Sequence, residues 1–237
     1  MHYVKRAIIM AAGYGSRMYP LTKTTPKPLI KVNGVRMIDN IIDALHKNEI
    51  YEIYVVVGYM KEKFYEWVKL YPGIKLIENP YYKDCNNISS LYVARDYIED
   101  SIIMDGDQVI YNSDVLHREF IRSGYNVTWQ EEETDEWLLK AKDDIIISCS
   151  RTGGKKGWRL YSVSRWTKDD GSKLKHHLEL EFNINGNREI YWDDVAMFCH
   201  RDEYELGICK MGENDITEID SIDELINIDN SYRKEEK

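Results

Sequence analysis

The sequence predicts an α/β protein with a Rossmann-like, mostly parallel (mixed) sheet flanked by helices, and a small β-rich extension. Two observations predict this class. Up to about Tyr111, short apolar segments alternate with segments of helical periodicity, as in a parallel sheet with both faces covered. After Tyr111, strand-like segments follow one another between charged turns, which favours an antiparallel extension.

The first part contains four predicted strands and the helices between them. The segment 37–45 has apolar residues on one helical face, and 53–57 is rich in β-branched residues before Gly58. Pro72-Gly73 marks a turn, and 78–80 opens a polar loop. The predicted order is strand 7–10, helix 37–45, strand 53–57, helix 62–70, strand 74–77, helix 88–98 and strand 101–104.

The second part is predicted to be mainly β-structure. The strand-like segments are 125–130, 136–139, 145–150 and 158–164, followed by a helix at 172–182 and a last strand at 216–219. Ser221 and Glu224 have the spacing of a capping box, which predicts the start of a C-terminal helix.

Composition and charge narrow the class of function. The net charge of −9 argues against general nucleic-acid binding. No apolar run reaches the roughly 20 residues that cross a bilayer, so we expect no membrane insertion. The four cysteines form no C-x-x-C pair, which suggests neither zinc nor a disulfide framework, and we expect a cytoplasmic location. Residues 1–38 contain seven basic and no acidic residues, which favours a small polyanionic ligand.

The segment 8–29, IIMAAGYGSRMYPLTKTTPKPL, is the strongest candidate for anion binding. It lacks the Gly-Lys pair of a P-loop and the third glycine of a dinucleotide fingerprint, and Pro20 excludes an immediate helix. We expect it to stay extended from Tyr19 to Pro28. Its glycines permit close backbone approach to phosphate, while Arg17 and Lys27 supply charge. The alternative is a tight turn with surface lysines.

The residues from Ala11 to Leu29 resemble the signature of nucleotidyltransferases that join an NTP to a phosphorylated small molecule. In that family the glycine loop surrounds the nucleotide, and the Arg and Lys act on its phosphates. The resemblance therefore implies catalytic roles for Arg17 and Lys27. The nucleotide-binding residues that it implies in this loop are Ala11, Ala12, Gly13, Gly15, Ser16, Arg17 and Lys27.

Two acidic pairs are candidates for a metal site. Asp105 and Asp107 follow the strand at 101–104, at the edge where ligands bind in open parallel sheets, and Asp193-Asp194 forms a second pair. Mg²⁺ prefers such oxygen ligands. The resemblance implies Asp107 and Asp193 as the catalytic metal ligands, with Asp194 as the alternative to Asp193, and Asp105 at the nucleotide. The structural alternative is a turn and a helix cap.

A further resemblance points to the bacterial CTP:phosphocholine cytidylyltransferases. It rests on the N-N-x-x-S-L-Y segment at 86–92 and on 136–137, 191–193 and 218–221. It implies that Asn86 and Ser89 lie near the cytosine. Aromatic faces beside acids suit a quaternary ammonium, and the implied choline-pocket residues are Trp137, Tyr191, Trp192 and Glu218. His176-His177 has no matched role and is expected at the surface.

The resemblance predicts one nucleotidyltransferase domain over 1–237, with a nucleotide-binding core at 1–111. Residues from about 112 to 237 then bind the acceptor and supply the second metal ligand. The predicted reaction is Mg²⁺-dependent transfer from CTP to phosphocholine. Alternatives are a sugar-1-phosphate nucleotidyltransferase using UTP or dTTP, a cytidylyltransferase for phosphoethanolamine or aminoethylphosphonate, and a non-catalytic regulatory module that binds nucleotide. The sequence does not predict the oligomeric state.

Overall fold

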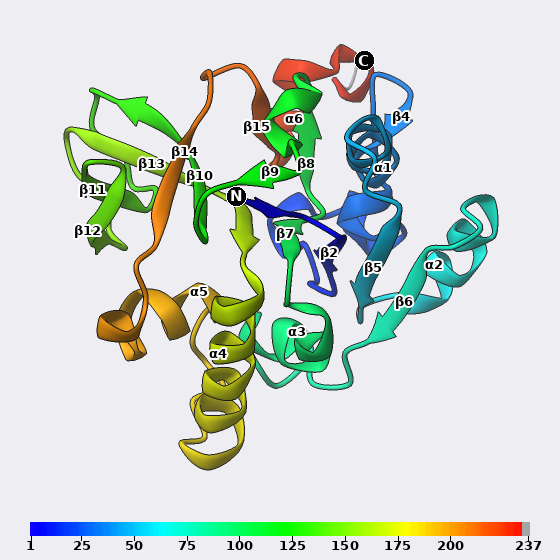
Figure 1. Ribbon diagram of the computed structural model, residues 1–237. Helices are drawn as coiled ribbons and strands as arrows, with labels where there is room; N and C mark the ends of the chain where they lie inside the picture. Colours follow the sequence, from blue (N-terminus) through cyan, green and yellow to red (C-terminus); the bar gives the residue numbers. More distant parts are fainter. Residues whose placement is uncertain (234–237) are drawn as a thin grey trace.

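A nine-stranded mixed sheet forms the centre of the computed structural model, which describes residues 1–233 (Figure 1). Its strand order is β10-β14-β12-β11-β13-β7-β2-β5-β6. The strands are β1 (His2–Tyr3), β2 (Arg6–Ala11), β3 (Lys31–Val32), β4 (Val35–Arg36), β5 (Glu52–Val57), β6 (Lys75–Glu78), β7 (Ser101–Asp105), β8 (Gln108–Ile110), β9 (Glu119–Phe120), β10 (Gly124–Gln130), β11 (Leu138–Lys142), β12 (Ile145–Ser150), β13 (Gly157–Trp166), β14 (Gly207–Lys210) and β15 (Ile216–Glu218).

Helices cover both faces of the parallel part of this sheet, which consists of β7, β2, β5 and β6. The side chains of β2 alternate between the two faces. Ala7 and Ile9 pack in the core beneath α1 and α2, whereas Ile8 and Met10 pack in the core beneath α3 and α4. The helices are α1 (Met37–Lys47), α2 (Lys61–Trp67), α3 (Ile88–Val93), α4 (Lys168–Glu179), α5 (Trp192–Asp194) and α6 (Ile222–Ile228).

The β-rich extension continues the same sheet. β13 pairs antiparallel with β7 at the edge of the parallel part. It also pairs with β10 and β11, so that β10, β14, β12, β11 and β13 form a closed ring of pairings at one side of the molecule (Figure 1). The predicted fold class, a mixed α/β sheet with a β-rich extension, is confirmed.

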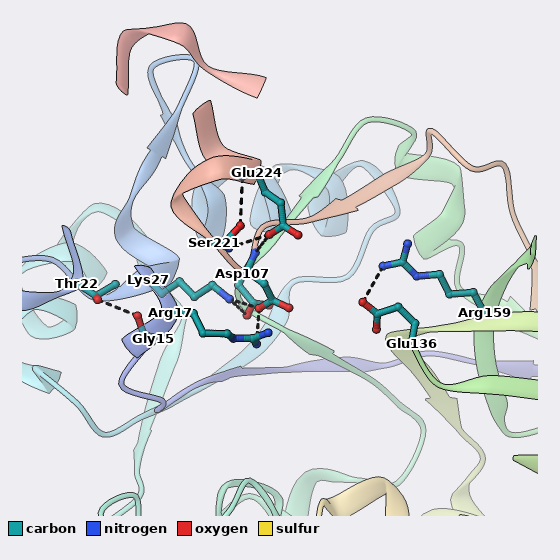
Figure 2. Close-up of polar contacts among 10 residues, drawn as sticks. Gly15, Arg17, Thr22, Lys27, Asp107, Glu136, Arg159, Ser221 and Glu224 are labelled. Atoms are coloured by element: carbon teal, nitrogen blue, oxygen red, sulfur yellow. Dashed lines mark hydrogen bonds and ion pairs between the residues drawn. The ribbon is translucent and has the colours of Figure 1, made fainter. Parts of the chain in front are cut away.

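The boundaries of several elements differ from the sequence prediction. The predicted helix 88–98 ends at Val93 and continues as a separate 3-10 turn, Arg95–Tyr97. The predicted helix 172–182 starts earlier, at Lys168, because the Thr167 hydroxyl caps it by accepting a hydrogen bond from Asp170 N. The capping box of α6 is confirmed, with Ser221 and Glu224 bonded to each other's backbone N–H (Figure 2).

A third, smaller core anchors the loop that follows β2. Met18 is fully buried there with Val109 of β8, Ile219 and Leu225 of α6. This core therefore holds residues of the phosphate-binding candidate against the C-terminal segment. No helix within residues 1–233 is long and apolar enough to cross a membrane.

Candidate active site

The glycine loop is folded into successive single turns and is not extended as predicted. Single 3-10 turns form at Ser16–Met18, Leu21–Lys23 and Lys27–Leu29. The prolines are compatible with these turns, because other residues donate the i to i+3 hydrogen bonds. Gly15 has a positive φ of 61°, and a Cβ there would lie 3.0 Å from Lys27 Cβ. Glycine at this position therefore brings the loop onto Lys27.

Lys27 is held in an almost fully buried position, with 8% of its surface exposed. Its Nζ donates to Asp107 Oδ2 at 2.6 Å (Figure 2). It also donates to Asp220 Oδ1 at 2.7 Å. Burial opposes the charge of the ammonium group, but the two carboxylates outweigh burial and raise the pKa of Lys27. Lys27 is therefore a fixed cation in contact with the predicted metal ligand Asp107.

Arg17 lies on the same side of the site and is mostly exposed. Its side chain is 70% exposed, and its NH2 donates to Asp220 Oδ1 at 2.7 Å. Asp220 thus joins the two predicted phosphate-binding cations. The structure brings Arg17, Lys27 and Asp107 together, which the sequence interpretation requires.

Three carboxylates gather beside these cations. Oxygen atoms of Asp105, Asp107 and Glu218 lie within 4.8 Å of one another. The antiparallel pairing of β15 with β8 places Glu218 opposite Gln108, one residue after Asp107. Burial, followed by repulsion from the neighbouring acids, raises the pKa values of Asp105 and Glu218 well above their usual range.

This acidic group fits a divalent cation. Asp107 Oδ1 is buried and accepts no hydrogen bond from any group within residues 1–233. Carboxylate oxygens are hard ligands of the kind Mg²⁺ binds, and a cation would relieve the mutual repulsion. The resemblance places Glu218 at the acceptor. In this structure its carboxylate lies beside the predicted metal ligand Asp107.

Asp193 and its neighbour Asp194 have different environments. Asp193 is buried in α5, and burial raises its pKa to about 7, against the effect of the Tyr125 hydroxyl. Asp194 accepts from Tyr191 N as a helix cap and forms an ion pair with Arg151 at 2.6 Å. Because these partners already bind the Asp194 carboxylate, Asp193 is the more available metal ligand of the two. Asp193 lines the same cavity as Asp105 and repels it.

The site consists of two cavities that share walls. A cavity of about 360 Å³ is lined by the glycine loop, and one of about 470 Å³ lies between the acids and the β-rich extension. Arg17, Asp107 and Asp220 line both. A ligand in one cavity would therefore meet a ligand in the other at these residues.

The second cavity has aromatic walls. Trp137 lies edge-to-face with Tyr191 at 5.7 Å and with Phe198 at 5.9 Å between ring centroids. The guanidinium of Arg151 stacks over Phe198, 4.1 Å from its centroid, and lies 5.8 Å from that of Trp137. The rings thus already contact a cation of the chain itself.

Trp192 does not line this cavity, in contrast to its predicted place in the acceptor pocket. It is 2% exposed and packs in the core against Tyr125 and Trp166. Tyr191 and Trp192 are adjacent at the start of α5, so their side chains diverge, and only Tyr191 faces the cavity.

Asn86 and Ser89 are used within the protein. Asn86 Nδ2 donates to Glu189 O at 3.1 Å, and the buried Ser89 hydroxyl donates to Asn86 O at 2.8 Å. Asn87, the second residue of the quoted pair, lines the acceptor-side cavity and accepts from Trp192 N. Ser89 therefore shapes the loop from inside, and its place near cytosine stays a prediction.

The residues of the cleft that had no role in the sequence interpretation include Asp220 and Arg151. Phe198 had none either, and it packs against Arg151 beside the cavity. Asp220 was visible as part of the quoted segment 218–221, but its contact with two cations depends on the pairing of β15 with β8. Arg151 and Phe198 had no motif of their own.

Comparison with known proteins identifies the family of this cleft. Residues 6–129 match the nucleotidyl transferase family. The chain belongs to that family. It is 38% identical to the 2-aminoethylphosphonate cytidylyltransferase of Lancefieldella rimae over 95% of this chain and 92% of that protein. It is 30% identical to the choline-phosphate cytidylyltransferase of Streptococcus pneumoniae over 97% of this chain and 99% of that protein.

A solved structure supports the same assignment. The structure of CTP:phosphocholine cytidylyltransferase from Streptococcus pneumoniae matches with a TM-score of 0.89 and 30% identity, over 98% of this chain and all of that one. The chain is thus an enzyme of the nucleotidyltransferase class, and the relatives named above, which match nearly its whole length, are cytidylyltransferases. The predicted family, fold and enzyme class are confirmed.

Proposed function

We propose that this protein transfers a cytidylyl group from CTP to a small zwitterionic acceptor with a phosphoryl or phosphonyl end and a cationic amine. The observation on which this rests is the shared wall of the two cavities, where Arg17 and Lys27 meet the acidic group. Two mutually repelling anions need such a meeting point. In this proposal residues 1–111 bind the nucleotide, and the remainder binds the acceptor.

The transfer needs no general base. An anionic oxygen of the acceptor attacks the α-phosphorus of CTP, the new P–O bond forms, and the bond to the β-phosphate oxygen breaks. The electron pair leaves with pyrophosphate. Arg17 and Lys27 would neutralise the triphosphate, so catalysis is mainly positioning and charge stabilisation.

The chain's own ion pairs keep the site assembled before substrate arrives. Lys27 is paired with Asp107 and Asp220, so phosphate oxygens would exchange for these carboxylates. The loop residues proposed around the nucleotide are Ala11, Ala12, Gly13, Gly15 and Ser16, all of which except Ala12 line the first cavity.

A bound Mg²⁺ would supply positive charge at the reacting phosphates. Asp107, Asp105 and Glu218 would hold it, with Asp193 as the further carboxylate predicted from the sequence. The uncoordinated Asp107 Oδ1 supports this assignment.

The geometry favours a primary ammonium, as in 2-aminoethylphosphonate, over the quaternary ammonium of phosphocholine. Arg151 already lies over Phe198 and beside Trp137, and a second cation on these ring faces would be repelled. A primary ammonium can instead donate hydrogen bonds to Asp135 or Glu136, which line the same cavity. The higher identity to the aminoethylphosphonate enzyme also supports this acceptor.

Phosphocholine is the second candidate, because Trp137 and Tyr191 offer ring faces to a methylated cation. We would measure pyrophosphate release from CTP with 2-aminoethylphosphonate, phosphoethanolamine, phosphocholine and a sugar 1-phosphate. The proposal expects the highest kcat/KM for 2-aminoethylphosphonate. A higher value for phosphocholine would favour the second candidate, and turnover only with a sugar phosphate would contradict both.

Arg151 gives a sharper test of the acceptor. Arg151→Ala removes the cation from the ring faces, so the ratio of kcat/KM for phosphocholine to that for 2-aminoethylphosphonate should rise. Lys155→Ala is the matched control, because Lys155 lies in the same connection between β12 and β13 and pairs only with Glu133 among the described residues. An unchanged ratio in Arg151→Ala would remove this argument for the primary ammonium.

A further inference from the structure

A cluster of two histidines and a glutamate lies outside the cleft, between α4 and the segment after α5. His177 belongs to α4 and is 4% exposed, which contradicts its expected place at the surface. His200 follows the π-helical turn Val195–Cys199, and Glu203 ends the next 3-10 turn. α4 and the α5 segment are neighbours in Figure 1, so the cluster joins two separate parts of the chain.

Each of the three side chains offers one ligand atom, and these atoms all lie within 4.8 Å of one another. Glu203 Oε2 lies 3.3 Å from His177 Nε2, and its Oε1 lies 3.6 Å from His200 Nδ1. Ligands bound to zinc at about 2.0–2.1 Å in a tetrahedron lie roughly 3.3–3.4 Å apart. The two distances end on different oxygens of Glu203, so bound zinc would draw the three ligand atoms from within 4.8 Å of one another to this spacing.

The other nitrogen of each histidine is already occupied. His200 Nε2 contacts Glu181 Oε1 at 2.9 Å, and His177 Nδ1 contacts the Tyr204 hydroxyl at 2.7 Å. Glu181 is itself fixed by hydrogen bonds from Asn185 and Asn187. Such outer partners are what metal-ligating histidines have, since they fix the tautomer and the direction of the free nitrogen.

We infer that His177, His200 and Glu203 form a transition-metal site of the zinc type, with solvent as the fourth ligand. Two imidazoles and a carboxylate are ligands that zinc accepts. The Glu203 side chain is 56% exposed, so an ion can enter from solvent. The rings of His177 and His200 are stacked nearly parallel with their centroids 3.8 Å apart, so one ring would have to turn out of the stack for both nitrogens to reach the ion. The metal would clamp α4 to the segment that leads back to Phe198 and Asp193.

The test is zinc retention by the full-length protein. The chain is stripped with a chelator, incubated with Zn²⁺ alone, dialysed and analysed by elemental mass spectrometry and isothermal titration. Glu203→Gln should weaken zinc affinity at least about 100-fold, and Glu181→Gln, which alters an outer partner, about 10–100-fold. His176→Gln is the matched control, because His176 is an exposed neighbour on α4 outside the cluster and should leave zinc binding unchanged.

Asp107→Asn separates this site from the acidic group in the cleft. The inference expects that Asp107→Asn retains zinc and that Glu203→Gln loses it. At roughly 100-fold excess over Kd, zinc should raise Tm by about 5–10 °C in wild type and not in Glu203→Gln. The metal-free Tm of Glu203→Gln should equal that of wild type, which excludes misfolding. Zinc lost only in Asp107→Asn, or no zinc retained by wild type, would overturn the inference.

Discussion

Replacing Lys27 by methionine is the most informative single change in the cleft. The substitution keeps most of the side-chain volume and removes the cation between Asp107 and Asp220, whose oxygens lie 2.6 and 2.7 Å from Nζ. Removing one partner of a buried ion pair costs about 3–5 kcal/mol. Because both carboxylates remain about one-fifth exposed, we take the lower end, about 3 kcal/mol.

This loss can be measured by thermal unfolding. A change of about 3 kcal/mol corresponds to a Tm decrease of roughly 6–12 °C in a chain of this size. Mg²⁺ should restore more of the Tm in Lys27→Met than in wild type, because it returns positive charge to the same carboxylates. Below the lowered Tm, turnover should fall roughly 100- to 1,000-fold, as expected for a lost charge-stabilising group.

Two controls make this prediction refutable. Lys23→Met changes an exposed lysine of the same loop and should affect neither Tm nor turnover. The double variant Lys27→Met/Asp107→Asn should be more stable than Lys27→Met alone, because one of the repelling acids has been neutralised. If Lys27→Met keeps the wild-type Tm and turnover, the central ion network has no role and the reasoning fails.

Three further predictions concern the loop, the acids and the base of the cleft. Gly15→Ala should lower Tm, because φ at Gly15 is positive and a Cβ there would lie 3.0 Å from Lys27. In Gly13→Ala the new Cβ meets no atom within 4 Å, so this variant should raise only the KM for CTP. Equal Tm values for the two variants would contradict this prediction. Asp193→Asn should raise the Tm of the metal-free protein at pH 8, because ionising a buried carboxyl whose pKa is raised to about 7 costs about 4 kcal/mol above that pH. This gain should shrink as pH falls toward 4, where native Asp193 is protonated and the cost is absent, so a pH-independent gain would refute the assignment. Trp137→Ala should raise the acceptor KM with little change in the KM for CTP, and an equal change in both would place the ring elsewhere.

The parts of the site that the sequence predicted are contiguous along the chain. The loop from Gly13 to Lys27 is one continuous segment, so its motif is enough to predict that these residues lie together. Asp107 follows shortly after the end of β7, so its place at the edge of the sheet was also predictable. The parts that sequence reasoning missed depend on long-range pairing. Asp220 reaches Lys27 only because β15 pairs with β8 and α6 packs below Met18.

Neighbouring residues with the same chemistry are the second limit of the sequence. In Tyr191-Trp192 both rings suit a cation pocket, but the turn into α5 buries Trp192 in the core and leaves Tyr191 in the cavity. In His176-His177, α4 exposes the first ring and buries the second. Composition does not predict which side chain of each pair faces the core, because α5 begins and α4 ends within a few residues of the pair.

The measurement that tests the central claim most directly is Mg²⁺-dependent pyrophosphate release from CTP and 2-aminoethylphosphonate, with the nucleotide product identified by mass spectrometry. We predict a CMP–aminoethylphosphonate product that forms only when CTP, the acceptor and Mg²⁺ are all present, and that is lost in Asp107→Asn. Turnover that persists in Asp107→Asn, or that proceeds from UTP or dTTP with a sugar phosphate and not from CTP, would contradict the account.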